Sequence, residues 1–158
     1  MSMRRPGVGD PAPDFDLVGT GGRRYSLSKL RGTPVVLIFY PGDDSAVCTI
    51  QLRSYSADFS EFTKLGAQVL ALSPQDIESH EAFASRHDLA MPLLVDECKR
   101  VAEAYNILGP IGFYRRSVFV VDGEGIIVYA HRSNAGMTYR KTPELIAAIQ
   151  LAVTGYDE

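Results

Sequence analysis

The sequence predicts one α/β domain in which helices cover both faces of a mixed central sheet. Two apolar, β-branched runs at 35–40 and 68–73 are typical of strands buried on both faces, and the helical pattern between them makes them a βαβ unit. Two further runs at 117–121 and 126–130 are joined by an Asp-Gly-Glu-Gly turn, which predicts an antiparallel hairpin. The 158 residues and the 46% hydrophobic content suit a single domain that spans residues 1–158.

Before the first buried strand, the sequence predicts a hairpin followed by a helical turn. Polar and apolar residues alternate at 14–17 and at 24–27, and the Gly-rich residues 19–22 form a turn between them. Residues 28–32 are predicted to form a short helical turn that ends at a glycine. The hairpin is therefore an N-terminal addition to the βαβ unit.

Between the two buried strands, apolar residues recur at spacings of three and four over residues 48–65. This period predicts one long helix, which Gly66 ends. Beyond the second strand, the pattern predicts a helix at about 77–87, a short strand at 91–95 and a helix at 99–105.

The last helix is predicted to have Thr142 as its N-cap and Pro143 in its first turn, and to run to about Val153. The order of elements is then hairpin, βαβ unit, helix, strand, helix, hairpin, helix. This is a thioredoxin-like fold with an N-terminal β-hairpin extension and an inserted helix and strand. Because that fold carries many functions, the activity has to be inferred from the site.

The composition argues against several classes of function. A net charge of −3 and a pI near 5.6 give no reason to expect a nucleic acid or a membrane surface as partner. The first residues are basic but no apolar stretch follows them, so no secretory signal is expected, and no segment is long enough to span a bilayer. Two cysteines in such a chain are expected to be thiols, which predicts a cytoplasmic protein.

Cys48 is the residue that points most directly to chemistry. It follows a turn at residues 41–44 and lies one helical turn after Ser45. In the first turn of a helix, backbone N–H groups and the helix dipole favour a thiolate over a thiol. The alternative is a buried core cysteine, because Cys48 is in phase with the apolar face of its predicted helix.

Three further residues could orient a substrate at this sulfur. Pro41 lacks an N–H group, so it can wall one side of the sulfur without competing for hydrogen bonds. Ser45 can accept or donate through its hydroxyl, and it can also serve as a plain N-cap. Arg116 comes just before the strand 117–121, at a rim where ligands bind in this kind of fold, and its permanent charge could hold a thiolate. The neighbouring Arg115 is the alternative, and the strand register favours Arg116.

These residues resemble the peroxiredoxin family of the AhpC/TSA superfamily. Pro41, Ser45 and Cys48 fit the pattern Pro-x-x-x-Thr/Ser-x-x-Cys, and Arg116 resembles the arginine at the start of a family strand. Residues 8–15 look like the family's Gly-x-x-Ala-Pro-x-Phe start. The run Phe-Tyr-Pro-Gly-Asp-Asp is closest to the bacterioferritin-comigratory-protein branch, also called PrxQ.

The resemblance implies a thiol-dependent peroxidase that reduces hydrogen peroxide and organic hydroperoxides. It makes Cys48 the peroxidatic cysteine, which becomes a sulfenic acid, while Ser45 and Arg116 hold the peroxide oxygens and Pro41 shields the pocket. It also implies that a thioredoxin, a glutaredoxin-like protein or a low-molecular-weight thiol reduces the sulfenic acid. Neither a metal nor a haem nor another cofactor is implied, and the branch includes monomers and homodimers.

The chain departs from the PrxQ pattern in the second half of the cycle. Many members carry Cys-Thr-x-Glu-x-Cys, whereas here Gln51 replaces the acid and Arg53 stands at the position of the resolving cysteine. We therefore expect a one-cysteine mechanism with an external thiol. Cys98 is expected to have no redox role, and the alternative is that it resolves Cys48 after local unfolding.

Two other functions compete with this one. A disulfide oxidoreductase of thioredoxin type would need a Cys-x-x-Cys motif, which does not occur in the sequence. A non-enzymatic thioredoxin-fold module, acting as a holdase or a redox-signalling partner, would leave Cys48 as a redox-inactive core residue.

The remaining polar residues of interest are predicted to be structural. His80, His87 and His131 are isolated in the sequence, whereas a metal site needs clustered ligands. Asp43 and Asp44 are expected to serve the turn and the N-terminus of the following helix.

Overall fold

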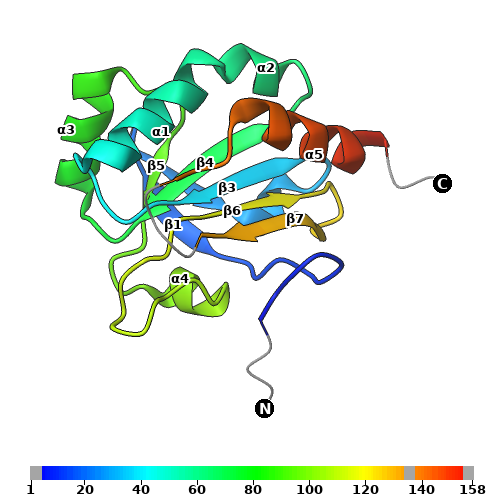
Figure 1. Cartoon of the computed structure of the whole chain (residues 1–158), viewed down its shortest axis with the longest axis horizontal. Coiled ribbons are helices and arrows are strands. Elements are labelled where there is room, and N and C mark those ends of the chain that lie inside the picture. The colour runs from blue at the N-terminus through cyan, green and yellow to red at the C-terminus, as the bar shows by residue number, and fades with distance from the viewer. Residues whose placement is uncertain (1–4, 134–137, 155–158) are drawn as a thin grey trace.

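A computed structural model shows a seven-stranded mixed sheet with helices on both faces, which confirms the predicted thioredoxin-like α/β class (Figure 1). It describes residues 5–133 and 138–154. The strands are β1 (Asp16–Gly19), β2 (Arg23–Ser26), β3 (Val35–Phe39), β4 (Gln68–Ser73), β5 (Leu93–Val95), β6 (Ser117–Val121) and β7 (Ile127–Arg132). The helices are α1 (Ala46–Ala57), α2 (Phe59–Thr63), α3 (Ile77–His87), α4 (Arg100–Ala104) and α5 (Thr142–Thr154), with a 3-10 turn η1 (Leu27–Leu30). None of the helices in this described part of the chain is long and apolar enough to cross a membrane.

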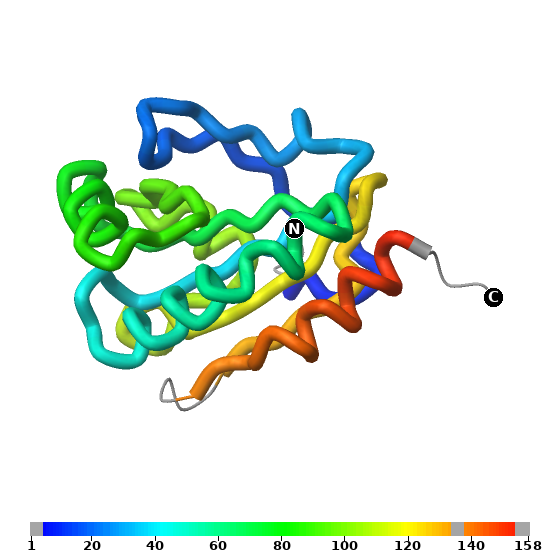
Figure 2. Tube along the Cα trace, turned by 90° about the horizontal axis from the view of Figure 1, so that it is seen from above, coloured from blue at the N-terminus to red at the C-terminus, as the bar shows by residue number. Residues whose placement is uncertain are grey.

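The strands follow the order β2-β1-β5-β4-β3-β6-β7 across the sheet. β3, β4 and β5 run parallel, and β6 and β7 extend the sheet in antiparallel fashion beyond β3. At the other edge, the predicted N-terminal hairpin forms β1 and β2, and β1 joins β5 through the pair of Gly19 with Leu94. Seen from above, the hairpin lies along one side of the molecule and α5 along the other (Figure 2).

β3 separates two hydrophobic cores, because successive side chains of a strand point to opposite faces. Val36 and Ile38 pack with side chains of α1, α2, α3 and α5, whereas Leu37 and Phe39 pack with side chains of η1 and α4. Figure 1 shows the same division, with α4 on the opposite face of the sheet from α1 and α5. All five residues of β3 are buried, which explains its unbroken apolar sequence.

The structure divides the predicted long helix of residues 48–65 into α1 and α2. Asp58 leaves the helical conformation between them, with φ −99° and ψ 17°. Tyr55 before this break and Phe62 after it face the same core. The prediction of one helix was therefore wrong because the apolar spacing continues across the break.

Thr142 does not cap α5 as predicted. Its buried Oγ1 finds no hydrogen-bond partner among the described residues. The carbonyl of Lys141 instead accepts hydrogen bonds from the backbone N–H groups of Glu144 and Leu145, at 3.1 and 3.4 Å. The helix thus begins at Thr142 itself, one residue earlier than predicted, and Lys141 takes the cap position.

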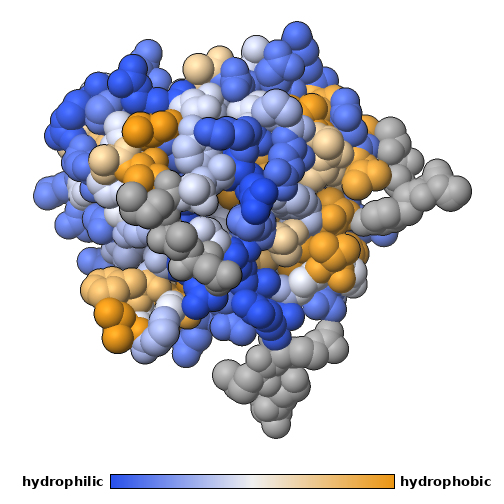
Figure 3. All heavy atoms as spheres, viewed as in Figure 1, coloured by the Kyte–Doolittle hydropathy of each residue, from blue (hydrophilic) through white to orange (hydrophobic). Residues whose placement is uncertain are grey.

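The loop between α4 and β6 carries two exposed apolar side chains. Ile111 is 79% exposed and Phe113 is 65% exposed, and apolar atoms gather at this corner of the surface, at the lower left of Figure 3. The loop is held in place by Lys99, whose Nζ donates to the carbonyl of Gly112 at 2.8 Å. It leads directly into Arg116 and β6.

Candidate active site

Cys48 lies in the first turn of α1 and is completely buried, with an exposed fraction of 0%. Ser45 is the N-cap of this helix, and its Oγ accepts a hydrogen bond from the backbone N–H of Cys48 at 3.3 Å. A hydroxyl in this position satisfies an N–H group that has no partner within the helix. The Ser-x-x-Cys spacing therefore builds this part of the site locally, with the sulfur at the positive end of α1.

Arg116 reaches the same sulfur from the start of β6. Phe39, the last residue of β3, pairs with Ser117, the first residue of β6. Arg116 therefore lies beside the end of β3, where the chain leaves the sheet and continues to Cys48. Its Nη1 donates to Cys48 Sγ at 3.3 Å, and the arginine is only 4% exposed. Arg115, the alternative considered from the sequence, is partly exposed.

Gln51 joins the site, although the sequence assigned it no role. It is fully buried, and its Oε1 accepts a hydrogen bond from Arg116 Nη1 at 2.7 Å. Its Nε2 donates to the hydroxyl of Tyr55 at 3.4 Å, and that hydroxyl donates to the carbonyl of Arg140. Burial raises the pKa of Tyr55 above its ordinary value, so the hydroxyl stays protonated. The sequence feature that indicates this role is the spacing of three residues between Cys48 and Gln51, which puts both on the same face of the helix.

The arrangement puts a permanent positive charge beside the sulfur of Cys48. A buried thiolate is costly without a partner, and Arg116 supplies a permanent positive charge at hydrogen-bond distance. Gln51 orients the guanidinium through a neutral oxygen, so it adds no negative charge beside the sulfur. The site thus holds a sulfur against a cation that can stabilise negative charge on the sulfur or on a nearby oxygen.

The side chain of Asp43 is buried inside the active-site turn (residues 41–45). Its Oδ1 accepts a hydrogen bond from the hydroxyl of Tyr40 at 2.7 Å. Its Oδ2 accepts a hydrogen bond from the hydroxyl of Ser79 at 2.7 Å and lies 2.7 Å from Nδ1 of His80. The reading of His80 as an isolated residue is therefore corrected, because His80 pairs with a carboxylate of the active-site turn.

These contacts make the stability of the fold depend on pH through Asp43. Burial raises the pKa of the Asp43 carboxyl, but hydrogen bonds from His80, Ser79 and Tyr40 outweigh burial and hold the pKa below its ordinary value of 3.8. A carboxyl with a lower pKa in the folded chain stabilises the fold fully above its unfolded pKa, and this contribution is lost as the pH falls through the folded pKa.

We expect Asp43→Asn to lower the free energy of unfolding by about 3 kcal/mol at pH 6, because it breaks a buried charged pair. The difference from the parent protein is expected to be smaller at pH 3, below the ordinary carboxyl pKa of 3.8, where the stabilisation by the Asp43 carboxylate has begun to be lost. Urea denaturation of both proteins at the two pH values measures this. A difference of the same size at both pH values would contradict the assignment.

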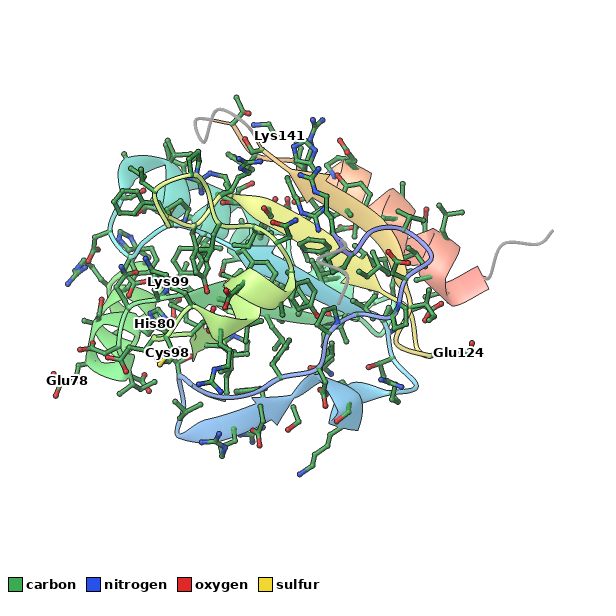
Figure 4. All side chains as sticks on the ribbon, turned by 90° about the horizontal axis from the view of Figure 1, so that it is seen from below. Glu78, His80, Cys98, Lys99, Glu124 and Lys141 are labelled. Atoms are coloured by element: carbon green, nitrogen blue, oxygen red, sulfur yellow. The ribbon has the colours of Figure 1, made fainter. Side chains whose placement is uncertain are left out.

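The other two residues predicted for the site lie in different surroundings. Pro41 is half-buried within the active-site turn. Cys98 is exposed on the loop between β5 and α4, next to Lys99 (Figure 4). Cys48 and Cys98 are both free thiols. The structure thus brings Ser45 and Arg116 into contact with Cys48, places Pro41 in the adjoining turn, and leaves Cys98 at the surface.

The three histidines lie on two elements of the fold. His80 and His87 belong to α3, and His131 belongs to β7. His87 packs edge-on against Phe83, with ring centroids 5.3 Å apart. Within residues 5–133 and 138–154, no group of three or more His, Cys, Asp or Glu side chains is placed to hold a metal ion.

Comparison with known families decides what kind of site this is. Residues 8–130 match the model of the AhpC/TSA family. The chain belongs to this family. The resemblance inferred from the residues around Cys48 is thereby confirmed.

Relatives of this peroxiredoxin support the same branch. The peroxiredoxin bcp of Helicobacter pylori strain J99 is 39% identical over 132 residues, which cover 79% of this chain and 87% of that protein. The crystal structure of peroxidoxin BcpB from Mycobacterium tuberculosis is similar with a TM-score of 0.83 at 26% identity, covering 92% of this chain and 97% of that one. The bacterioferritin comigratory protein of Xanthomonas campestris, studied for its alkyl peroxide reduction activity, gives a TM-score of 0.77 at 27% identity, covering 86% and 90% of the two chains.

The protein is therefore a thiol-dependent peroxidase, an oxidoreductase that takes hydroperoxides as substrates and thiols as reductants. This confirms the class of function predicted from the sequence.

Proposed function

We propose that Cys48 is the peroxidatic cysteine of this peroxiredoxin and that Ser45, Arg116 and Pro41 complete its site. The observation that carries the proposal is the 3.3 Å contact between Arg116 Nη1 and Cys48 Sγ inside the core. A buried sulfur at a helix N-terminus, paired with a guanidinium, has the surroundings that a nucleophilic thiolate requires.

In the first half-reaction, the Cys48 thiolate attacks the distal oxygen of the hydroperoxide. The O–O bond breaks as an S–O bond forms, so the sulfur is oxidised by two electrons to a sulfenic acid and the peroxide is reduced. The leaving hydroxide or alkoxide takes a proton from water. The Arg116 guanidinium and the Ser45 hydroxyl hold the peroxide oxygens, and Pro41 offers no N–H group that would compete for them.

The substrates are hydrogen peroxide and organic hydroperoxides. Support for the organic class comes from the Xanthomonas campestris relative, which is described by its alkyl peroxide reduction activity. Single-turnover rate constants for hydrogen peroxide and for an alkyl hydroperoxide, measured on the same preparation, compare the two classes.

The second half-reaction uses an external thiol in a one-cysteine mechanism. Cys48 is buried in the first turn of α1, whereas Cys98 is exposed on the loop after β5, and both are free thiols. This difference in burial supports an external thiol as the partner of Cys48. The exposed Arg53 stands where many PrxQ members carry a resolving cysteine, which supports the same proposal.

The external reductant is a thioredoxin, a glutaredoxin-like protein or a low-molecular-weight thiol. Its first thiol attacks the sulfenic sulfur of Cys48, which forms a mixed disulfide and releases water. A second thiol then attacks the sulfur of the reductant in that disulfide, so that Cys48 leaves as a thiol and the reductant is oxidised. Peroxide turnover measured with each donor class in turn identifies the reductant.

Intact mass after one equivalent of peroxide tests the one-cysteine mechanism. We expect a gain of one oxygen atom, which a sulfenic-acid reagent traps, and the same result in Cys98→Ser. A loss of two hydrogens within a monomer, abolished by Cys98→Ser, would contradict this and favour Cys98 as the resolving residue.

We also propose that the protein is cytoplasmic and acts as a monomer or a homodimer. Its two cysteines are free thiols, which suits a reducing compartment. Cell fractionation checks the location, and sedimentation velocity over a range of protein concentrations distinguishes the two oligomeric states.

A further inference from the structure

Asp43 and His80 form a buried pair that takes no part in the proposed reaction with peroxide. Their side chains are only 2% and 0% exposed, and Asp43 Oδ2 lies 2.7 Å from His80 Nδ1. Asp43 belongs to the active-site turn, and His80, labelled in Figure 4, belongs to α3. The pair therefore joins the segment that precedes Cys48 to a helix that comes later in the chain.

The hydrogen bonds around the pair indicate that both side chains are charged. Nε2 of His80 lies 2.9 Å from the carbonyl oxygen of Leu94, so both ring nitrogens face oxygen acceptors. Both nitrogens can donate only in the imidazolium form. The carboxylate of Asp43 accepts further hydrogen bonds from the hydroxyls of Tyr40 and Ser79, which is how a buried ion pair becomes tolerable.

The pair also belongs to a larger network that holds the active-site turn. The backbone N–H of Asp43 donates to Gln75 Oε1 at 2.8 Å, and the same oxygen accepts a hydrogen bond from the hydroxyl of Ser73 at 2.5 Å. The turn is thus held by α3, by the end of β4 and, through His80, by β5. Asp44, the next residue, has a half-exposed side chain that pairs with Arg86 at the surface.

The two half-reactions need Cys48 in two different positions, one buried and one accessible. Reaction with peroxide needs the sulfur beside Arg116, as it is in the structure. Reduction by an external thiol needs the sulfur to become accessible, yet Cys48 is 0% exposed. The active-site turn and the first turn of α1 therefore have to open between the two half-reactions.

We propose that the Asp43–His80 pair positions the active-site turn, and that its strength determines how often Cys48 opens to a thiol reductant. The proposal rests on Cys48 being the peroxidatic cysteine. Asp43 and His80 act as positioning residues. Removing either partner leaves a buried charge without its counterpart, so the closed turn loses stability relative to the open one.

The test compares Asp43→Asn with Asp44→Asn, which makes the same chemical change one residue further along. Both are made in Cys98→Ser, so that Cys48 is the only thiol. Alkylation of Cys48 by a bulky maleimide measures opening, and hydrogen exchange followed by mass spectrometry measures protection in residues 40–52. For Asp43→Asn we expect alkylation roughly tenfold faster, and protection in 40–52 that is weaker than in the parent and stays below the protection of β4 and β6. For Asp44→Asn we expect less than a twofold change.

A second pair of variants tests the coupling. His80→Gln alone is expected to speed alkylation as Asp43→Asn does. In the double variant both side chains are neutral amides that can hydrogen-bond to each other, so we expect alkylation slower than the product of the two single effects.

Three results would overturn the proposal: unchanged alkylation in both single variants, single effects that simply multiply in the double variant, or protection in 40–52 that equals the protection of β4 and β6. The last would show that Cys48 becomes accessible only when the whole fold opens, so that no separate opening of the turn exists. None of these measurements uses peroxide. If the parent protein failed to consume peroxide, the proposed reaction would be wrong, while alkylation and hydrogen exchange would still measure the opening of the turn.

Discussion

Replacing Arg116 by alanine is expected to lower the second-order rate constant for hydrogen peroxide by about 100-fold to 1,000-fold. The variant loses the one cation shown within hydrogen-bond distance of Cys48 Sγ among the described residues, and it loses a donor for the peroxide oxygen. Stopped-flow measurement of single-turnover oxidation gives the rate constant.

Arg115→Ala is the matched control for this prediction. Arg115 is adjacent in sequence but partly exposed, so its loss is expected to change the rate constant less than about twofold. Arg116→Lys keeps the charge but loses the planar, multidentate donor, and we expect a rate between those of the parent and Arg116→Ala. Equal losses in Arg115→Ala and Arg116→Ala would remove Arg116 from the site.

Cys48→Ser is expected to reduce thiol-dependent peroxide consumption by about 10⁴-fold or more, to the background of the reductant alone. A serine hydroxyl stays protonated at neutral pH and cannot form a sulfenic acid, so no partial reaction remains. The loss is expected without unfolding, since the two side chains are similar in size. Cys98→Ser is the control, and it is expected to keep the parent rate with a low-molecular-weight thiol as donor.

Persistent peroxide consumption in Cys48→Ser would contradict the mechanism, provided that the protein is free of metal contamination. Circular dichroism of both variants separates loss of chemistry from loss of fold. A Cys48→Ser protein that is folded and inactive, beside an active Cys98→Ser protein, is the pattern that the proposal requires.

The sheet could be predicted from the sequence because its central strands are buried on both faces. β3 and β4 read as unbroken apolar runs, since each of their faces meets a different core. The division between α1 and α2 could not be predicted, because the break at Asp58 leaves the apolar spacing intact. A backbone conformation at one residue has no periodic signal.

The site could be predicted where its geometry is local. Ser45 and Cys48 are three residues apart, so the helix itself brings them together. Arg116 is 68 residues from Cys48 and required the family pattern in addition to its place before a strand. The partnership of Arg116 with Gln51 spans 65 residues, and no spacing rule reports it.

The Asp43–His80 pair shows the same limit. The two residues are 37 positions apart, and each has a structural reading of its own, as a turn residue and as an isolated histidine. Only the packing of α3 against the active-site turn joins them. Contacts between buried side chains of different elements are therefore the features of this protein that are hardest to predict from its sequence.

Mapping the sulfenic acid tests the central claim most directly. The parent protein is treated with one equivalent of hydrogen peroxide in the presence of a sulfenic-acid reagent, then digested and sequenced by mass spectrometry. We predict that the adduct lies on Cys48 while Cys98 remains a thiol. An adduct on Cys98, with Cys48 unmodified, would contradict the account.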